Sequence, residues 1–228
     1  MAHLEGGKPG QSLRDKVLER VRSDIVSGRN GPGAMYSVPS LASELGVSTT
    51  PVREALLELS NQGMIVPMRN RGFKVQAPTV EELENLFEIR ELLERFAVVQ
   101  VAKIGVQNPK ELRALADRIA AAVKQMDVRG YLEADRDFHE ALVSQAKNPR
   151  LAKMIMDLRD AMRLYGIDTP AGRERQRASV KEHYELIDLA AAGETKAIGT
   201  LISRHIMDWQ SIFTKALADQ TAKRPLQR

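Results

Sequence analysis

The chain has 228 residues, of which 43% are hydrophobic, 28% are charged and only 4% are aromatic. This composition predicts a helical globular protein that is long enough for two small domains or one large one. Cysteine is absent from the sequence, which excludes disulfides and thiolate metal sites. Apolar runs are too short for a membrane span or a signal peptide, so we expect a cytoplasmic protein without a membrane partner.

The net charge of +4 is concentrated at the two ends of the chain. Residues 1–77 carry 10 Lys and Arg against 7 Asp and Glu, whereas residues 78–222 carry 21 against 23. The last six residues add three further positive charges, and we expect residues 221–228 to be a flexible basic tail. The basic excess of the front part is compatible with nucleic-acid binding there.

Residues 1–11 are predicted to be disordered, and residues 12–77 to form a first domain. A capped helix is expected from Ser12, with the apolar stripe Leu13, Val17, Val21 and Ile25 and an end at Gly28. It is followed by a short helix over 39–45 and a helix from Ser48 to near Gly63. Two β-prone runs at 64–68 and 73–76 complete the domain. Three helices followed by a hairpin are typical of a winged helix-turn-helix domain.

The third of these helices begins with the unusual sequence STTPVREAL. At a helix N-terminus the backbone N–H groups are free, so the hydroxyls of Ser48, Thr49 and Thr50 can cap the helix or donate to a phosphate. Arg53 lies outside the buried stripe and could bind a phosphate or a guanine in the major groove. Alternatively, Ser48 is only a cap and Arg53 only a solvated charge. The preceding LASELGV helix and the arginines at the predicted hairpin tip favour DNA binding.

Residues 78–220 are predicted to form a second, all-helical domain. Gln76 to Pro78 indicate a linker, and Thr79 with Glu82 form a second capping box. Proline, glycine and asparagine residues then mark the boundaries between helices. The helices are expected over about 79–105, 109–126, 130–147, 150–166, 172–192 and 195–220. The fold class is therefore mainly α, with a winged helix-turn-helix domain followed by an antiparallel bundle of about six helices.

Three histidines of the second domain fall into register with one carboxylate. Asp135 and His139 are four residues apart on one helix, so they project from the same face. His183 and His205 lie at similar distances on either side of Gly193, which brings them to a similar level in an antiparallel helix pair. Such a set can bind a divalent ion, with Zn, Ni, Mn or Fe as candidates. Each histidine could instead be an ordinary hydrogen-bonded residue.

Arg90 lies beside an apolar stripe in the sequence EIRELLE, and two interpretations remain open for it. It could point into the bundle and bind an anionic ligand, or it could form an ion pair with Glu94 at the i+4 position.

The run from LASELGVSTTPVREAL through the hairpin resembles the DNA-binding domain of the GntR family of bacterial transcription regulators. The rest is similar to the FadR-type branch, whose helical (FCD) ligand domain carries DxxFH and two later histidines. Six helices favour the shorter, VanR-like version of this branch. The resemblance implies DNA contacts by Ser48, Thr50 and Arg53, a wing turn at Gly72, and metal binding by Asp135, His139, His183 and His205. Thr49, Arg69 and Arg71 are further candidates for DNA contacts from their positions at the helix start and the hairpin tip. It also implies that Arg90 helps to hold a carboxylate effector.

The implied function is that of a sequence-specific transcription regulator, with repression as the expected mode. A homodimer would bind a palindromic operator in double-stranded DNA, and a small organic acid at the metal would change its affinity. Two positions depart from the family pattern, since Thr49 and the Pro39-Ser40 pair stand where the family often has arginine. Two alternatives remain: a metal-dependent hydrolase or lyase of the helical domain, and an architectural DNA binder that senses no ligand.

Overall fold

The computed structural model describes residues 11–26, 29–76, 78–162 and 166–222, with side chains as far as residue 219. The chain divides into two compact units between Pro78 and Thr79. The predicted disordered segment 1–11 lies outside the described residues except for Gln11, as do Gly28 and residues 223–228 of the predicted tail. No helix in the described ranges combines the length and the apolar character needed to cross a membrane.

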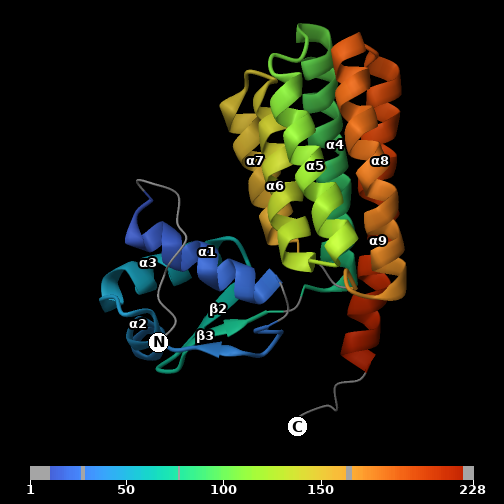
Figure 1. The fold of residues 1–228 in the computed structure, drawn as a ribbon. Coiled ribbons are helices and arrows are strands. Elements are labelled where there is room, and N and C mark those ends of the chain that lie inside the picture. Colours follow the sequence, from blue (N-terminus) through green and yellow to red (C-terminus); the bar gives the residue numbers. More distant parts are fainter. Residues whose placement is uncertain (1–10, 27–28, 77, 163–165, 223–228) are drawn as a thin grey trace. The chain divides into compact units, whose positions relative to one another are not determined.

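The first unit is a winged helix-turn-helix fold, which confirms the predicted fold class. Its elements in chain order are α1 (Leu13–Val26), β1 (Met35–Tyr36), α2 (Val38–Leu45), α3 (Thr49–Asn61), β2 (Ile65–Met68) and β3 (Gly72–Val75). The strands form an antiparallel sheet in the order β1-β3-β2 (Figure 1). The apolar stripes of α1 and α3 enclose a small core with residues of the sheet, including Tyr36, Ile65 and Phe73.

Two details of the first unit differ from the sequence-based predictions. The strand β1 was not predicted, because two residues carry no alternation pattern and Met35 and Tyr36 become a strand only by pairing with Lys74 and Phe73. Leu13 was expected in the buried stripe of the first helix, but it is 53% exposed. It lies in the first turn of α1, and the core contacts begin one turn later at Val17.

The second unit is a bundle of six helices whose connections are mostly short turns, so that consecutive helices run antiparallel (Figure 1). They are α4 (Val80–Ile104), α5 (Pro109–Gln125), α6 (Val128–Ser144), α7 (Pro149–Ala161), α8 (Pro170–Ala192) and α9 (Thr195–Ala222). The capping box that opens α4 forms as predicted, because Thr79 accepts from the N–H of Glu82 and the Glu82 carboxylate accepts from the N–H of Thr79.

Several helix ends lie away from their predicted positions for local reasons. α6 begins at Val128 and not at Gly130, because the Asp127 side chain caps the helix by accepting from the N–H of Gly130. α8 begins at Pro170, where Thr169 provides the cap and proline occupies the first turn, in which its missing N–H costs no hydrogen bond. α7 ends at Ala161, before the predicted end at residue 166.

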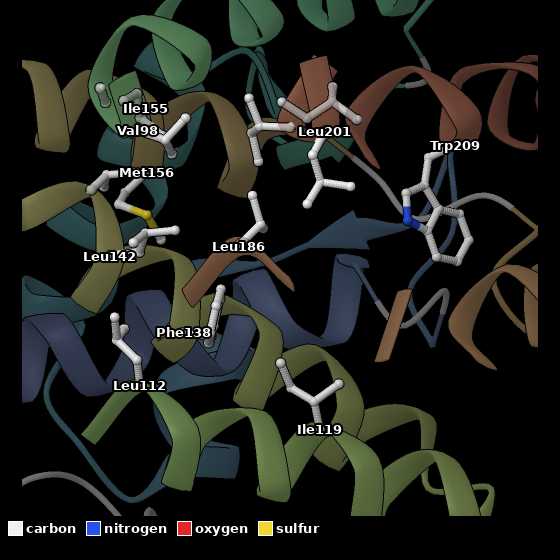
Figure 2. Packing of buried hydrophobic residues seen from close by; sticks show 14 of the residues in the cluster. Val98, Leu112, Ile119, Phe138, Leu142, Ile155, Met156, Leu186, Leu201 and Trp209 are labelled. Carbon is white, nitrogen blue, oxygen red and sulfur yellow. The ribbon is translucent and has the colours of Figure 1, made fainter. Parts of the chain in front are cut away.

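Side chains from all six helices meet in one apolar core, which holds the helices in register. Figure 2 shows Val98, Leu142, Leu186 and Leu201 among them, from α4, α6, α8 and α9. Within this core a small group of buried polar residues interrupts the apolar packing, and it includes the three histidines of the second unit. A buried polar group must find hydrogen-bond partners or a ligand, so this group is the natural place to look for a function.

Candidate functional site

The N-terminal end of α3 presents the polar residues that the sequence singled out. Ser48 is the N-cap residue with an extended backbone, yet its hydroxyl makes no capping hydrogen bond. Thr49, Thr50 and Arg53 are exposed like Ser48, while the stripe beneath them, which includes Val52 and Leu56, is fully buried. The interpretation of Ser48 as a side-chain cap is therefore wrong, and its hydroxyl is available to an external acceptor such as a phosphate.

The hairpin of β2 and β3 carries two further predicted residues at its tip. Arg69 and Arg71 are exposed on either side of Asn70, which has a left-handed backbone with φ of 59°. Gly72 follows with φ of 100°, and a Cβ atom at this position would overlap the carbonyl oxygen of Tyr36 on β1. Gly72 is therefore required by the fold of the hairpin, whatever it contacts on DNA.

The four predicted metal ligands come together inside the second unit. Asp135 and His139 come from α6, His183 from α8 and His205 from α9, and one ligand atom from each lies within 4.8 Å of the others. We call these four residues the Asp/His cluster. All three imidazoles are at most 1% exposed, and the Asp135 side chain is 18% exposed. The expectation that the histidines share one level of the bundle is thus met by the geometry.

Each imidazole of the Asp/His cluster has an acceptor beside its Nδ1 atom. The Nδ1 of His183 lies 2.7 Å from the carbonyl oxygen of Ser179, and the Nδ1 of His205 lies 2.7 Å from the Glu182 carboxylate. The Nδ1 of His139 lies 3.3 Å from the Glu94 carboxylate but makes no hydrogen bond with it. An acceptor at Nδ1 selects the tautomer in which Nε2 has a free lone pair. In His183 and His205 the Nε2 atom is therefore the one that is available to a metal ion.

The Nε2 atoms of His139 and His183 face the Asp135 carboxylate but make no hydrogen bond with it. The Asp135 Oδ1 atom lies 3.2 Å from Nε2 of His183 and 3.7 Å from Nε2 of His139. Both of these Nε2 atoms are buried and have no hydrogen-bond partner. Leaving a buried polar atom unpaired costs about 1 to 3 kcal/mol. A divalent ion would satisfy these atoms, and imidazole and carboxylate are donors that suit it.

The aromatic ring of Phe138, the F of DxxFH, packs against the imidazoles. Its ring centre lies 4.7 Å from that of His183 and 5.4 Å from that of His139, both edge to face. This contact fixes the ring planes and keeps one side of the cluster apolar.

A chain of buried charges joins Arg90 to the Asp/His cluster. Arg90 donates from Nε to Glu94 at 2.6 Å, and Arg159 of α7 donates to both Glu94 oxygens at 2.9 and 3.1 Å. Arg159 also donates to Oδ2 of Asp135. We call Arg90, Glu94 and Arg159 the arginine–glutamate chain. Both interpretations of Arg90 hold in part, since it points into the bundle and is paired with Glu94.

The charged groups around the cluster set its protonation state. Burial alone would raise the pKa of the Asp135 and Glu94 carboxyls, but the Arg159 charge and its neighbours hold both well below their usual range. Burial and the Arg159 charge lower the pKa of His139 to about 3, against the opposing effect of the carboxylates of Asp135 and Glu94. Burial likewise lowers the pKa of His205 to about 4, although its hydrogen bond with Glu182 opposes this. Neutral imidazoles and ionised carboxylates are the forms that bind metals.

Sequence reasoning missed four residues that support the cluster, namely Glu94 as a partner of His139, Arg159, Arg175 and Glu182. Glu94 and Glu182 add two carboxylates that lie beside the ligands. The spacing of seven residues between Arg175 and Glu182 places these two side chains on one helix face, which was a usable signal. Arg159 gave none, because it reaches Asp135 only through the packing of α7 against α4 and α6.

Comparison with known families matches both units of the chain. The model described as bacterial regulatory proteins, gntR family, matches residues 13–75, and the FCD domain model matches residues 85–208. The first match contains α3 and the hairpin, and the second contains the whole Asp/His cluster.

Individual relatives give the same result. An HTH-type transcriptional regulator from the TAR-I ttuE-ttuC' intergenic region of Agrobacterium vitis is 30% identical over 167 residues, which span 61% of this chain and 98% of that one. The gluconate operon transcriptional repressor of Bacillus subtilis is 26% identical over 75% of this chain and 68% of its own length. The solved structure of E. coli McbR superimposes with a TM-score of 0.80 at 25% identity, covering 92% of this chain and 99% of McbR.

Proposed function

Because the chain belongs to the gntR family of bacterial transcription regulators and carries an FCD domain, we propose that a small organic acid, bound beside a divalent metal in its helical unit, controls its affinity for operator DNA. The family consists of regulators and not of enzymes, so the alternative of a hydrolase or lyase is set aside. Glu94 and Glu182 also argue against catalysis, because each is engaged by arginine and histidine partners and neither is a free base.

The observation that carries the metal proposal is the set of buried Nε2 atoms that face Asp135 without hydrogen-bond partners. Asp135, His139, His183 and His205 would hold the ion, and the chemistry of these donors suits Zn, Ni, Mn or Fe. When bound, the ion supplies positive charge and open coordination positions for a carboxylate. Around it, Ser179, Glu182 and Glu94 hold the rings, and Arg159 holds the second oxygen of Asp135.

The arginine–glutamate chain is the proposed link between the acid and the metal. Arg90 is 7% exposed and already shares the Glu94 carboxylate with Arg159. An acid that accepts a hydrogen bond from Arg90 competes with Glu94 for that donor. Because Glu94 also lies beside His139, this competition would change the surroundings of a proposed metal ligand. Arg90 therefore remains our candidate for effector binding.

DNA binding is assigned to the exposed end of α3 and to the hairpin, which acts as the wing. The free hydroxyls of Ser48, Thr49 and Thr50 and the N–H groups of the helix start would donate to phosphates. Arg53 would read a guanine in the major groove. At the wing, Arg69 and Arg71 would add backbone contacts, and Gly72 would keep the tip narrow.

A homodimer is proposed from a row of apolar side chains on α4. Ile89, Leu92 and Phe96 are 47%, 64% and 55% exposed, and their spacing of three and four residues places them on one helix face. Apolar side chains that gather on one surface stripe mark an interaction site, and a two-fold axis lets the same stripe serve both partners. Two copies of α3 would then bind the half-sites of a palindrome about one DNA turn apart.

The experiment that tests this function measures operator affinity in the presence and absence of metal and acid. Duplexes selected from a random pool by the full-length, zinc-loaded protein provide the DNA, and fluorescence anisotropy provides the affinity. We expect one or more members of a carboxylic-acid panel to change the affinity by about 5-fold or more. His183→Ala should still bind the duplex but should lose the response, because it removes one metal ligand.

Two results would contradict the proposal. If no acid changes DNA affinity, and none raises the melting temperature of the wild-type protein in a way that His183→Ala abolishes, the chain is an architectural DNA binder. If His183→Ala responds to the acid as the wild type does, the Asp/His cluster is not where the acid acts.

A further inference from the structure

Arg175 of α8 is a buried guanidinium next to the Asp/His cluster that has no assigned role. It is 7% exposed, and its Nη2 donates to Glu182 at 2.6 Å and to the carbonyl oxygen of His205 at 3.0 Å. Its Cζ atom lies 5.7 Å from the ring centre of Trp209. Because Glu182 also accepts from His205, Arg175 is separated from a metal ligand by a single side chain.

Most of the hydrogen-bonding capacity of Arg175 is unused. Its Nε and Nη1 atoms are buried and have no hydrogen-bond partner. A guanidinium carries five N–H groups, and Nε and Nη1 account for three of them. Arg159 differs in this respect, because it donates to Glu94 and Asp135 from both of its terminal nitrogens. Buried N–H groups of a cation are costly without acceptors, and an anionic ligand would supply them.

The charge balance around the cluster gives a second, independent indication. The buried arginines Arg90, Arg159 and Arg175 are matched by three carboxylates, Glu94, Asp135 and Glu182. The neutral imidazoles contribute no charge. A divalent ion would therefore bring two positive charges that none of these described neighbours compensates. Uncompensated buried charge is strongly unfavourable. A ligand with two negative charges would restore neutrality, whereas a monocarboxylate would leave one charge unbalanced.

We propose that Arg175 binds a second anionic group of the effector, and that the effector is accordingly a dicarboxylate whose other carboxylate lies at the metal. This inference rests on the proposed function, because it assumes that an organic acid binds at the Asp/His cluster. It adds the class of acid and the residue that selects it. Arg175 is distinct from Arg90, which reaches the cluster from α4 through Glu94, whereas Arg175 reaches it from α8 through Glu182.

Calorimetric titration of the full-length, zinc-loaded protein tests the inference. The probes are the straight-chain dicarboxylates from malonate to adipate and the monocarboxylates with the same numbers of carbons. We expect at least one dicarboxylate to bind the wild type about tenfold or more tightly than its monocarboxylate counterpart, which is the effect of one added charge-assisted contact. Arg175→Gln should remove this preference while keeping its zinc, although the loss of the ion pair with Glu182 should lower its melting temperature. Arg177→Gln is the matched control, since Arg177 is exposed on the same helix.

The other outcomes separate the inference from the function on which it rests. An Arg175→Gln protein that keeps the wild-type preference would overturn the role of Arg175 and leave the proposed function intact. Equal binding of the two acid classes by the wild type would overturn the dicarboxylate assignment alone. Loss of zinc in Arg175→Gln would assign Arg175 to the support of His205 instead. Failure of every acid to bind the wild type would remove both the inference and the proposed function.

Discussion

At the scale of single residues, the Asp/His cluster is organised by the neighbours of its ligands. Ser179 and Glu182 hold the Nδ1 side of His183 and His205, Glu94 lies beside His139, and Arg159 holds the remaining oxygen of Asp135. The ligand atoms are therefore oriented before any ion arrives, which lowers the cost of binding it. The same arrangement places neutral imidazoles in a buried site, and this has a consequence for stability.

The metal-free protein should lose stability in weak acid. His139 and His205 have folded-state pKa values of about 3 and about 4, against 6.5 for an exposed histidine. Between pH 6.5 and 4 the unfolded chain therefore takes up protons that the folded chain does not. The stabilisation is complete above pH 6.5 and is lost as the pH falls through the folded values, at about 1.4 kcal/mol per pH unit for each ring. Thermal melts of the metal-free protein from pH 7.5 to 4.5 measure this loss of stability.

The control for this prediction is His205→Gln, which removes one of the two rings and should make the pH dependence about half as steep. A wild-type melting temperature that stays constant between pH 6.5 and 4.5 would show that the imidazoles are not held neutral by their surroundings.

Arg53→Ala should abolish sequence-specific DNA binding while leaving the fold and the metal content unchanged. The side chain is exposed, so its removal should alter the free energy of unfolding by no more than about 0.5 kcal/mol. A good arginine–guanine contact contributes about 1 to 3 kcal/mol, and a dimer loses it in both half-sites. Anisotropy with a selected duplex gives the affinity, and Arg177→Ala serves as a control for loss of one exposed charge. Unchanged specific binding by Arg53→Ala would refute the assignment of α3 as the recognition helix.

Part of the site could be predicted from the sequence, for identifiable reasons. Asp135 and His139 share a helix face by their spacing alone. Gly193 marks the turn between two helices, and His183 and His205 lie at similar distances from it. The contacts of Glu94 and Arg159 with the cluster depend on how α4 and α7 pack against α6, and no local pattern encodes that. The interpretation of Ser48 as a side-chain cap was also wrong, because a residue type that is favoured at the N-cap position need not use its hydroxyl for capping.

At the scale of elements, the helices follow from local signals, whereas the small sheet does not. Thr79, Asn108, Asn148 and Thr169 each accept a hydrogen bond from the backbone at the start of a helix, and such caps can be recognised in a sequence. The strand β1 depends on pairing with β3 almost forty residues later, as the register of Tyr36 with Phe73 shows. Its existence is therefore a property of the folded unit and not of its own two residues.

Gly72→Ala should disrupt the wing. The backbone there has φ of 100°, and a methyl group would overlap the Tyr36 carbonyl oxygen, so the β1–β3 pairing must shift. Strain of this kind costs about 1 to 3 kcal/mol, which should lower the melting temperature of the first unit and weaken DNA binding together. Circular dichroism melts and anisotropy measure the two effects. Arg71→Ala, on the adjacent exposed residue, should weaken binding without lowering the melting temperature. A Gly72→Ala protein with wild-type stability would show that the hairpin tolerates a side chain there.

At the scale of the whole molecule, the proposed control of DNA binding requires two copies and a link between two units. In this proposal the acid binds in the helical unit, and the winged units respond through the linker near Pro78. Such a change can shift DNA affinity only if the acid binds more tightly to one arrangement of the dimer than to the other. The oligomeric state is therefore a condition of the mechanism.

Leu92→Glu combined with Phe96→Glu should convert the proposed dimer to a monomer. Both side chains are more than half exposed on α4, so the change should leave the core of the bundle intact while placing four charges at a two-fold interface. Native mass spectrometry gives the subunit count, and the loss of paired half-site binding should follow. Met154→Glu, at an exposed apolar residue of α7, is the control. A double variant that remains dimeric would place the interface elsewhere.

The central claim is that the Asp/His cluster is a metal centre, and elemental analysis of the purified, dialysed protein tests it most directly. After incubation with zinc, nickel, manganese or ferrous iron, the wild type should retain one divalent ion per chain for at least one of these metals. His183→Ala should retain little or none of it, and Arg177→Gln should match the wild type. A wild-type protein that retains no stoichiometric ion from any of the four metals, or a His183→Ala protein that retains as much as the wild type, would contradict the account.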